Sequence, residues 1–224
     1  MAEQPSGTTQ SPRSLLERLP SLTILGPLVA LLLAIVFFSL QSDRFLTGQN
    51  FSLILQQVSV VAVLAIGQTL IILTAGIDLS VGFVMALGTM VMAKFAVDLG
   101  MPPLLAILCG MAVTTAFGFL NGFLITRFKL PTFIVTLGTM NIAIALTQIY
   151  SRDQTGSNLP DAHLFWGNTF RLGETVFTYG VVLVIVLYLL VWFFLSETAP
   201  GRHLYAVGNN PEAARLMGIP TQRV

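Results

Sequence analysis

The sequence predicts an all-α integral membrane protein, a polytopic helical bundle with about six transmembrane helices in this chain. Hydrophobic residues make up 54% of its 224 residues and charged residues only 9%, against about 25% charged residues in an average soluble domain. Five runs of 22 to 33 residues carry no charge: 19–42, 45–77, 99–126, 130–151 and 175–196. A helix needs about 20 mostly apolar residues to cross a bilayer. These runs are continuous rather than alternating, which argues against a membrane β-barrel.

The charge-free runs divide the chain into three regions. Residues 1–20 are polar and predict a disordered cytoplasmic tail. Residues 21–196 form the predicted transmembrane domain, and residues 197–224 form a cytoplasmic segment after it. The spans are predicted near 22–40, 52–75, 81–97, 104–126, 132–150 and 176–195. The third span starts from a run of only 15 uncharged residues, Leu79 to Ala93, and reaches full length if Lys94 extends its ammonium toward the headgroups.

Basic residues suggest how the spans are oriented. With the N-terminus inside, the inner segments hold seven basic residues: Arg13, Arg18, Arg127, Lys129, Arg202, Arg215 and Arg223. The outer segments hold four: Arg44, Lys94, Arg152 and Arg171. Basic residues concentrate on the cytoplasmic side of membrane proteins. We therefore expect a cytoplasmic N-terminus, a first span retained as an anchor rather than cleaved as a signal peptide, and a long outer loop at 151–175.

Amides and hydroxyls interrupt the apolar spans. A polar group in hydrocarbon must find a hydrogen-bond partner, so these side chains either join helices to one another or line a path for a neutral, hydroxyl-rich solute. Both interpretations stay open. The candidates for a translocation path are Gln68, Asp78, Ser80, Asn121, Thr136 and Asn141.

Two further patterns have a structural and a functional interpretation. Gly76 can end one helix in the left-handed conformation, and Asp78 or Ser80 can cap the next. This link is either a tight inner turn or part of the path. In the fourth span, Gly110, Thr114, Gly118, Gly122 and Thr126 recur every four residues and place small side chains on one helix face. Ordinary helix packing explains that stripe, and a moving or pore-forming interface is the alternative.

A short helix is predicted beyond the last span. Asn210 suits the N-cap, and Pro211 suits the first helical position. Glu212 near the start and Arg215 near the end complement the helix dipole. Gly218 ends the helix in this prediction. A helix of about two turns is marginal alone in water, so we expect it to dock on another surface.

Residues for chemistry are missing from the sequence. His163 and His203 fall in segments predicted to lie on opposite sides of the membrane, and the single cysteine, Cys109, excludes an internal disulfide. The sequence has no phosphate-binding glycine loop, nucleophile motif or metal-ligand spacing. With a net charge of +1 it also gives no sign of a nucleic-acid partner. We expect no enzyme activity, no metal and no cofactor.

Three segments resemble one family. Residues 201–220, GRHLYAVGNNPEAARLMGIP, are similar to the cytoplasmic coupling loop of ABC-type permeases of the ribose/xylose/galactose importer branch. Residues 76–82, GIDLSVG, and residues 130–139, LPTFIVTLGT, resemble two other segments of that branch. The resemblance covers roughly Phe51 to Val224.

The resemblance implies a permease subunit in the bacterial inner membrane that carries a monosaccharide. It implies a cytoplasmic ATP-binding subunit, an extracytoplasmic sugar-binding protein, a second permease copy and the surrounding lipid as partners. The residues that would couple to the ATPase are Gly201, Tyr205, Gly208, Asn209, Asn210, Pro211, Glu212, Ala213, Ala214 and Gly218. Members of the branch continue with further spans, so we expect this chain to be truncated at its C-terminus.

A secondary transporter or channel for a small polar solute is the alternative. Ion-coupled carriers place ionisable residues in mid-membrane, whereas these spans are nearly free of charge. A membrane-embedded enzyme ranks last, because acid, base and metal groups are missing.

Overall fold

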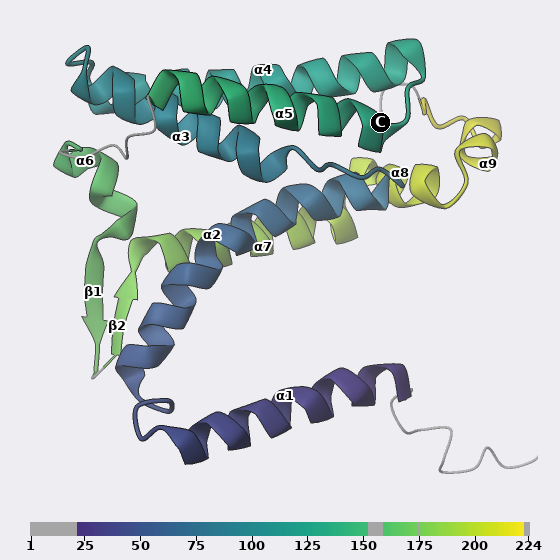
Figure 1. Ribbon diagram of the computed structural model, residues 1–224. Coiled ribbons are helices and arrows are strands. Elements are labelled where there is room, and N and C mark those ends of the chain that lie inside the picture. The colour runs from purple at the N-terminus through teal and green to yellow at the C-terminus, as the bar shows by residue number, and fades with distance from the viewer. Residues whose placement is uncertain (1–21, 152–158, 174, 222–224) are drawn as a thin grey trace, which may run out of the picture. The chain divides into compact units, whose positions relative to one another are not determined.

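The computed structural model describes residues 22–151, 159–173 and 175–221, and these are mainly helical (Figure 1). The chain divides into two compact units, Met1–Asn50 and Phe51–Val224, which are described separately. The predicted tail at residues 1–20 lies outside the described residues, as do Arg152 and Arg223.

The first unit contains helix α1, Leu22–Gln41, and the start of α2, Gly48–Leu73. Between them a turn is fixed by hydrogen bonds: Ser42 N donates to Phe38 O at 3.1 Å, and Asn50 Nδ2 donates to Phe45 O at 2.7 Å. The described apolar side chains of α1 are exposed within this unit. An apolar helix with no protein cover requires a nonaqueous surrounding or a partner.

The second unit holds most of α2 and four more long helices. They are α3, Val81–Val97; α4, Pro103–Phe128; α5, Thr132–Ser151; and α7, Tyr179–Glu197. Among the described residues, four helices, α2, α4, α5 and α7, are long and apolar enough to cross a membrane, judged by length and composition. The stretch Leu25–Gln41 of α1 and the helix α3 are apolar but shorter. These helices and the family described below confirm the predicted fold class, a polytopic helical membrane protein.

Helices α3, α4 and α5 pack side by side (Figure 1). Their common core contains Val84, Leu87 and Val91 of α3 and Ala143 of α5, with Phe117 of α4 packed against it. Larger apolar residues such as Phe119 and Ile149 point outward and are about three-quarters exposed, at 74% and 76%. Such an inside-out distribution is costly in water and suits helices that face lipid.

The segment predicted as the long outer loop contains regular structure. Helix α6, Asp161–Leu164, leads into a 3-10 turn, η2, at Phe165–Gly167. Strands β1, Thr169–Leu172, and β2, Thr175–Thr178, follow as an antiparallel pair in which Phe170 lies opposite Phe177. Residues 176–178, placed in the sixth span by the sequence, therefore belong to β2, and α7 starts at Tyr179.

One local prediction about a helix end is wrong. The left-handed residue after α2 is Ala75, with φ of 59°, and not Gly76. Gly76 is required instead for close packing, because a Cβ there would lie 2.9 Å from Ile71 Cγ2. Beyond α7 the chain forms the predicted short helix, α9, Pro211–Leu216, and before it a helix that was not predicted, α8, Ala199–Asn209. Thr198 starts α8 by accepting a hydrogen bond from Gly201 N.

Candidate functional site

The link between α2 and α3 is not helical, and side chains of α5 meet its backbone. Thr132 Oγ1 accepts from Ile77 N, and Thr136 Oγ1 accepts from Leu79 N, both at 3.2 Å. The Thr136 side chain is only 2% exposed. Backbone groups removed from water must find protein partners, so two hydroxyls of α5 take the place of the helical bonds that the link lacks.

Asp78 folds back on the link. Its Oδ1 accepts from Ser80 N at 2.7 Å and from Ser80 Oγ at 2.6 Å. This local side-chain-to-backbone turn is typical of aspartate before a helix. Ser80 occupies the N-cap of α3, but its own side chain makes no capping bond. Of the two predicted capping residues, Asp78 is therefore the one that satisfies a backbone N–H.

Asn121 of α4 completes a polar cluster, by which we mean Asp78, Ser80, Asn121 and Thr136. Asn121 Nδ2 donates to Ser80 Oγ at 3.1 Å, and the two residues are 5% and 1% exposed. Three elements distant in sequence, the α2–α3 link, α4 and α5, thus meet through hydrogen bonds. Four of the six predicted path residues belong to this cluster.

The other two path candidates lie elsewhere. Asn141 is exposed on α5, and its Nδ2 donates to Leu137 O of the same helix at 2.8 Å. Gln68 of α2 is half-buried, and its Oε1 is buried without a hydrogen-bond partner among the described residues. The structure does not join either side chain to the polar cluster.

A cavity of about 440 Å³ opens beside the polar cluster. Asp78, Ser80 and Asn121 line one part of it, and apolar or hydroxyl side chains line the rest. The wall comes from α2, α3 and α4: Leu64, Val81, Val84, Met85, Thr89, Met92, Gly110, Met111, Thr114, Thr115 and Gly118. Such a largely apolar hollow with a few polar groups is the usual form of a small-molecule site.

The small-residue stripe of α4 divides into two parts. Gly110 is buried against α3, where a Cβ on Gly110 would lie 2.6 Å from Gly88 O. Gly118 and Gly122 are exposed, and a Cβ on either would meet nothing within 4 Å. Close helix packing therefore explains Gly110, whereas it does not explain the two later glycines within the described residues.

Helix α8 meets other helices backbone to backbone. A Cβ at Gly208 would overlap Leu73 O at the end of α2, and a Cβ at Gly201 would overlap Phe194 O in α7. Neither position has room for a side chain as long as α8 keeps its place. The glycines of α8 thus set its distance from α2 and α7.

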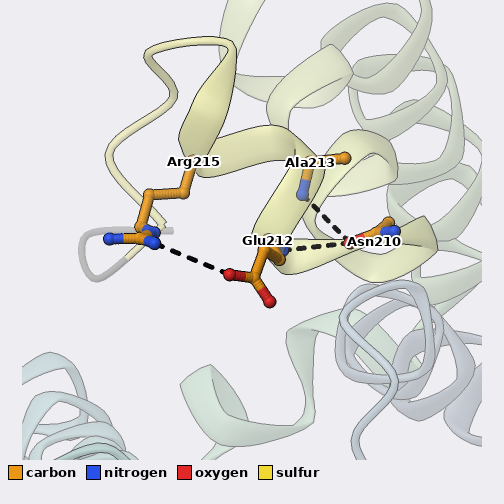
Figure 2. Close-up of polar contacts among 4 residues, drawn as sticks. All are labelled: Asn210, Glu212, Ala213 and Arg215. Carbon is orange, nitrogen blue, oxygen red and sulfur yellow. Dashed lines mark hydrogen bonds and ion pairs between the residues drawn. The ribbon is translucent and has the colours of Figure 1, made fainter.

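Helix α9 has the predicted caps (Figure 2). Asn210 Oδ1 accepts from Glu212 N and from Ala213 N, both at 3.0 Å. Arg215 pairs with Glu212 across one turn, with 3.6 Å between nitrogen and oxygen. Gly218 follows with φ of 84°, a left-handed conformation that favours glycine at a helix end. The predicted N-cap at Asn210 and the helix end at Gly218 are confirmed.

The predicted coupling residues differ in exposure. Gly201 and Ala214 are buried and Gly208 is half-buried, and the two glycines pack against the backbone of α7 and α2. The exposed members are Tyr205, Asn209, Asn210, Pro211, Glu212, Ala213 and Gly218. The segment therefore has an inner side made of small residues and an outer side open to a partner.

These features gather at one end of the second unit. Ile77 in the α2–α3 link donates a hydrogen bond to Thr132 at the start of α5, and Gly208 of α8 lies against Leu73 at the end of α2. The start of α5 and α8 are therefore both neighbours of the link. At the far ends of α3 and α5, Lys94, Asp98 and Tyr150 line a separate hollow, with Lys94 Nζ 3.1 Å from Asp98 Oδ2. Helices α3 and α5 consequently run in the same direction, and α4 returns between their ends.

Within residues 22–151, 159–173 and 175–221, no group of three histidine, cysteine, aspartate or glutamate side chains could hold a metal ion. Both ring nitrogens of His163 are buried without a hydrogen-bond partner among these residues. The groups that line the large cavity are amide, hydroxyl, carboxylate and apolar side chains. This arrangement can bind a solute, and it lacks an acid–base pair for catalysis.

The chain is similar to sugar import permeases. It is 43% identical over 205 residues to the fructose import permease protein FrcC of Rhizobium meliloti, covering 88% of this chain and 57% of that protein. It is 35% identical over 202 residues to the ribose import permease protein RbsC of Bacillus subtilis, covering 89% and 62%. The chain thus spans about three-fifths of the length of these relatives. No solved structure matches it.

A family model described as the permease component of the branched-chain amino acid transport system matches residues 50–224. The match includes the polar cluster, the cavity and both C-terminal helices. Members of this family are transport subunits rather than enzymes. The chain therefore belongs to the family of branched-chain amino acid transport system permease components.

Proposed function

We propose that this chain is the membrane-spanning permease subunit of an ATP-driven ABC importer and that it carries a neutral monosaccharide such as fructose or ribose. Relatives with these two sugars in their names match nearly nine-tenths of the chain. The chain spans about three-fifths of the length of those relatives, and the support for its cargo lies in its own side chains.

The single observation that carries the cargo assignment is the lining of the cavity. Its polar groups are one carboxylate, one amide and hydroxyls, and none of the residues that line it is lysine, arginine or histidine. A branched-chain amino acid would bring a carboxylate that needs a cation or several N–H donors when it leaves water. A sugar brings neutral hydroxyls, which amides and hydroxyls can satisfy. The lining favours the sugar.

Helices α8 and α9 are the proposed contact with a cytoplasmic ATP-binding subunit. The exposed side from Tyr205 to Gly218 would meet the ATPase, and the contact of Gly208 with Leu73 would pass its movement to the α2–α3 link. That link ends in the polar cluster beside the cavity. A second permease copy, surrounded by lipid like this chain, and an extracytoplasmic sugar-binding protein complete the proposed assembly.

The proposed location is the bacterial inner membrane, with the N-terminus cytoplasmic. Residues 1–20 would form a cytoplasmic tail, residues 21–196 the membrane domain and residues 197–224 the cytoplasmic coupling segment. Arg127 and Lys129 flank the end of α4, and Arg202 and Arg215 lie in α8 and α9. All four belong to the end where the link and α8 meet, and the positive-inside rule favours that end as cytoplasmic.

Uptake by reconstituted vesicles tests the proposal. Proteoliposomes would hold this chain with its ATPase, its second permease copy and its binding protein, and they would be offered labelled D-fructose, D-ribose or L-leucine. We expect sugar uptake that requires ATP and little uptake of leucine. Leucine uptake that exceeds sugar uptake would refute the cargo, and sugar uptake independent of ATP would refute the coupling.

A further inference from the structure

Another hollow, of about 290 Å³, lies between α2 and α7, and we call it the α2–α7 slot. Trp166 and Gly167 of η2 line it beside the start of α7, where strands β1 and β2 lead into that helix (Figure 1). Farther along, Tyr188 of α7 donates a hydrogen bond to Ala62 O of α2 at 3.3 Å. The slot therefore lies between η2 and a point where the two helices are joined directly.

The side chains that line the slot change in character along it. At the η2 end they carry polar groups: Gln56, Ser59, Thr178 and Trp166. Trp166 marks this end, because its carbonyl oxygen would lie 3.1 Å from a Cβ on Gly180, in the first turn of α7. Farther from η2 the lining of both helices is aliphatic, made of Val60, Val63, Leu183 and Val184. None of the residues that line the slot is charged.

The length of the two helices places this gradient in the bilayer. From Gln56 to Leu73 in α2, and from Gly180 to Glu197 in α7, each helix rises about 26 Å at about 1.5 Å per residue. Both far ends lie at α8, which meets Leu73 through Gly208 and begins directly after α7. The hydrocarbon core of a bilayer is about 30 Å thick. The polar end of the slot therefore lies close to the headgroups on the side opposite α8, and its aliphatic part lies within the hydrocarbon.

We propose that the α2–α7 slot is a lipid site, which takes one acyl chain of a phospholipid along Val60, Val63 and Leu183 and places the headgroup beside Trp166. A phospholipid has the same order of polar and apolar parts as the slot, and tryptophan is favoured at headgroup depth. Because none of the lining residues is charged, the site recognises the chain rather than the charge of the headgroup. Such a site is independent of the solute that the protein carries.

Water, a sugar and a second helix fit the slot less well. An aliphatic hollow stays dry. A sugar would leave hydroxyls unpaired against valine and leucine, and Ser59 Oγ already donates to Gln56 O at 2.7 Å. One turn of a helix, about 10 Å across and 5.4 Å long, takes up roughly 400 Å³, which is more than the slot offers. A neighbouring helix could therefore cover the slot but not enter it, whereas a flexible acyl chain can.

Fluorescence of Trp166 in the purified chain, held in detergent micelles, tests the site. Trp192→Phe leaves Trp166 as the only tryptophan, and Trp192 does not line the slot. A phosphatidylcholine brominated on its acyl chain, which quenches tryptophan on contact, is added in increasing amounts. We expect quenching that saturates at about one lipid per chain, as a single site requires. Bromine near the headgroup should quench more strongly than bromine near the methyl end.

Filling the slot should exclude the lipid. In the Trp192→Phe chain, Val63→Phe places a larger side chain in the aliphatic part. We expect it to raise the lipid concentration for half-maximal quenching at least about tenfold, because overpacking disfavours a second occupant. Val61→Phe is the matched control, since Val61 is on the same helix, is 64% exposed and lies outside the slot lining. We expect it to leave lipid binding unchanged.

Four results would overturn the lipid site. Quenching that grows in proportion to the lipid without saturation would mean contact with bulk lipid only, and this titration does not depend on whether Val63→Phe folds. Equal quenching of Val63→Phe and Val61→Phe would place the lipid outside the slot. Protection of Trp166 from the brominated lipid by D-fructose would make the slot a sugar site. Efficient disulfide formation between copies that carry Val63→Cys and Cys109→Ala would show that a second copy covers it.

Discussion

Replacing Thr136 by valine tests how the α2–α3 link is held. Valine keeps the shape and volume of threonine but loses the hydroxyl that accepts from Leu79 N at 3.2 Å. Thr136 is 2% exposed, so water cannot easily replace the lost acceptor. The same hydroxyl also donates to Thr132 O at 2.9 Å within α5. That carbonyl lies in the first turn of a helix and keeps its helical partner.

The expected cost follows from the orphaned Leu79 N–H. A buried donor left without a partner costs about 1–3 kcal/mol. Measured side-chain hydrogen bonds inside one membrane protein average about 0.6 kcal/mol, because the unfolded chain in the membrane also finds partners. The donor here belongs to the backbone of a link without helical hydrogen bonds. We therefore expect Thr136→Val to lower the free energy of unfolding by at least about 1 kcal/mol, which changes the folded-to-unfolded ratio about fivefold.

Reversible unfolding in mixed micelles of lipid and detergent measures this change. Thr126→Val is the matched control, since Thr126 is exposed and its hydroxyl donates to Gly122 O of its own helix at 2.7 Å. That substitution should stay within about 0.5 kcal/mol of the unchanged chain. The reasoning is refuted if the two valine variants unfold at the same denaturant concentration, because the link would then not depend on Thr136.

Three other substitutions, one of them with a matched control, test the remaining contacts. Gly110→Ala should destabilise the chain by about 1–3 kcal/mol through overpacking against α3, whereas Gly122→Ala, which meets open space, should be neutral in the same unfolding experiment. Gly208→Ala should displace α8 from the end of α2 and abolish ATP-driven uptake in the reconstituted importer while ATP hydrolysis continues; unchanged uptake would contradict the proposed transmission. Asn210→Ala should cost about 1 kcal/mol of local stability in α9, visible as faster amide hydrogen exchange at residues 212 and 213, and unchanged exchange would show that the cap is dispensable.

The long helices could be predicted because hydropathy alone determines them. A stretch without charge and of sufficient length has few stable arrangements in a bilayer other than a helix. The predicted stretch 104–126 lies within α4, Pro103–Phe128, and 132–150 lies within α5, Thr132–Ser151. The helix ends are less predictable, since they depend on capping and on neighbouring backbone. Ala75, rather than the expected Gly76, adopts the left-handed conformation for this reason.

The polar cluster shows what sequence spacing leaves open. Asp78, Ser80, Asn121 and Thr136 could each be recognised as polar residues among apolar ones, but their meeting depends on how α4 and α5 are aligned against the link. One turn of slippage would separate Asn121 from Ser80. Asn141 illustrates the same limit, because its amide could be predicted as a path candidate but lies on the outer face of α5.

The elements that the prediction missed are short ones. Strands β1 and β2 have four residues each, and Phe170 of one lies opposite Phe177 of the other. The spacing of apolar residues over so few positions does not distinguish a strand from a helix. Helix α8 had a usable signal, namely Thr198 before Ala199 and Pro200, a helix start of the same kind as Asn210 before Pro211. The glycines inside α8 obscured it, because glycine disfavours helix interiors.

The meeting of Gly208 with Leu73 has a mechanical consequence. Where two helices touch through side chains, rotamer changes can absorb a small displacement before the backbone responds. At this contact a bare Cα faces a peptide carbonyl, and no rotatable group lies between them. A shift of α8 must therefore move the end of α2 directly, because no side chain between the two backbones can absorb the displacement.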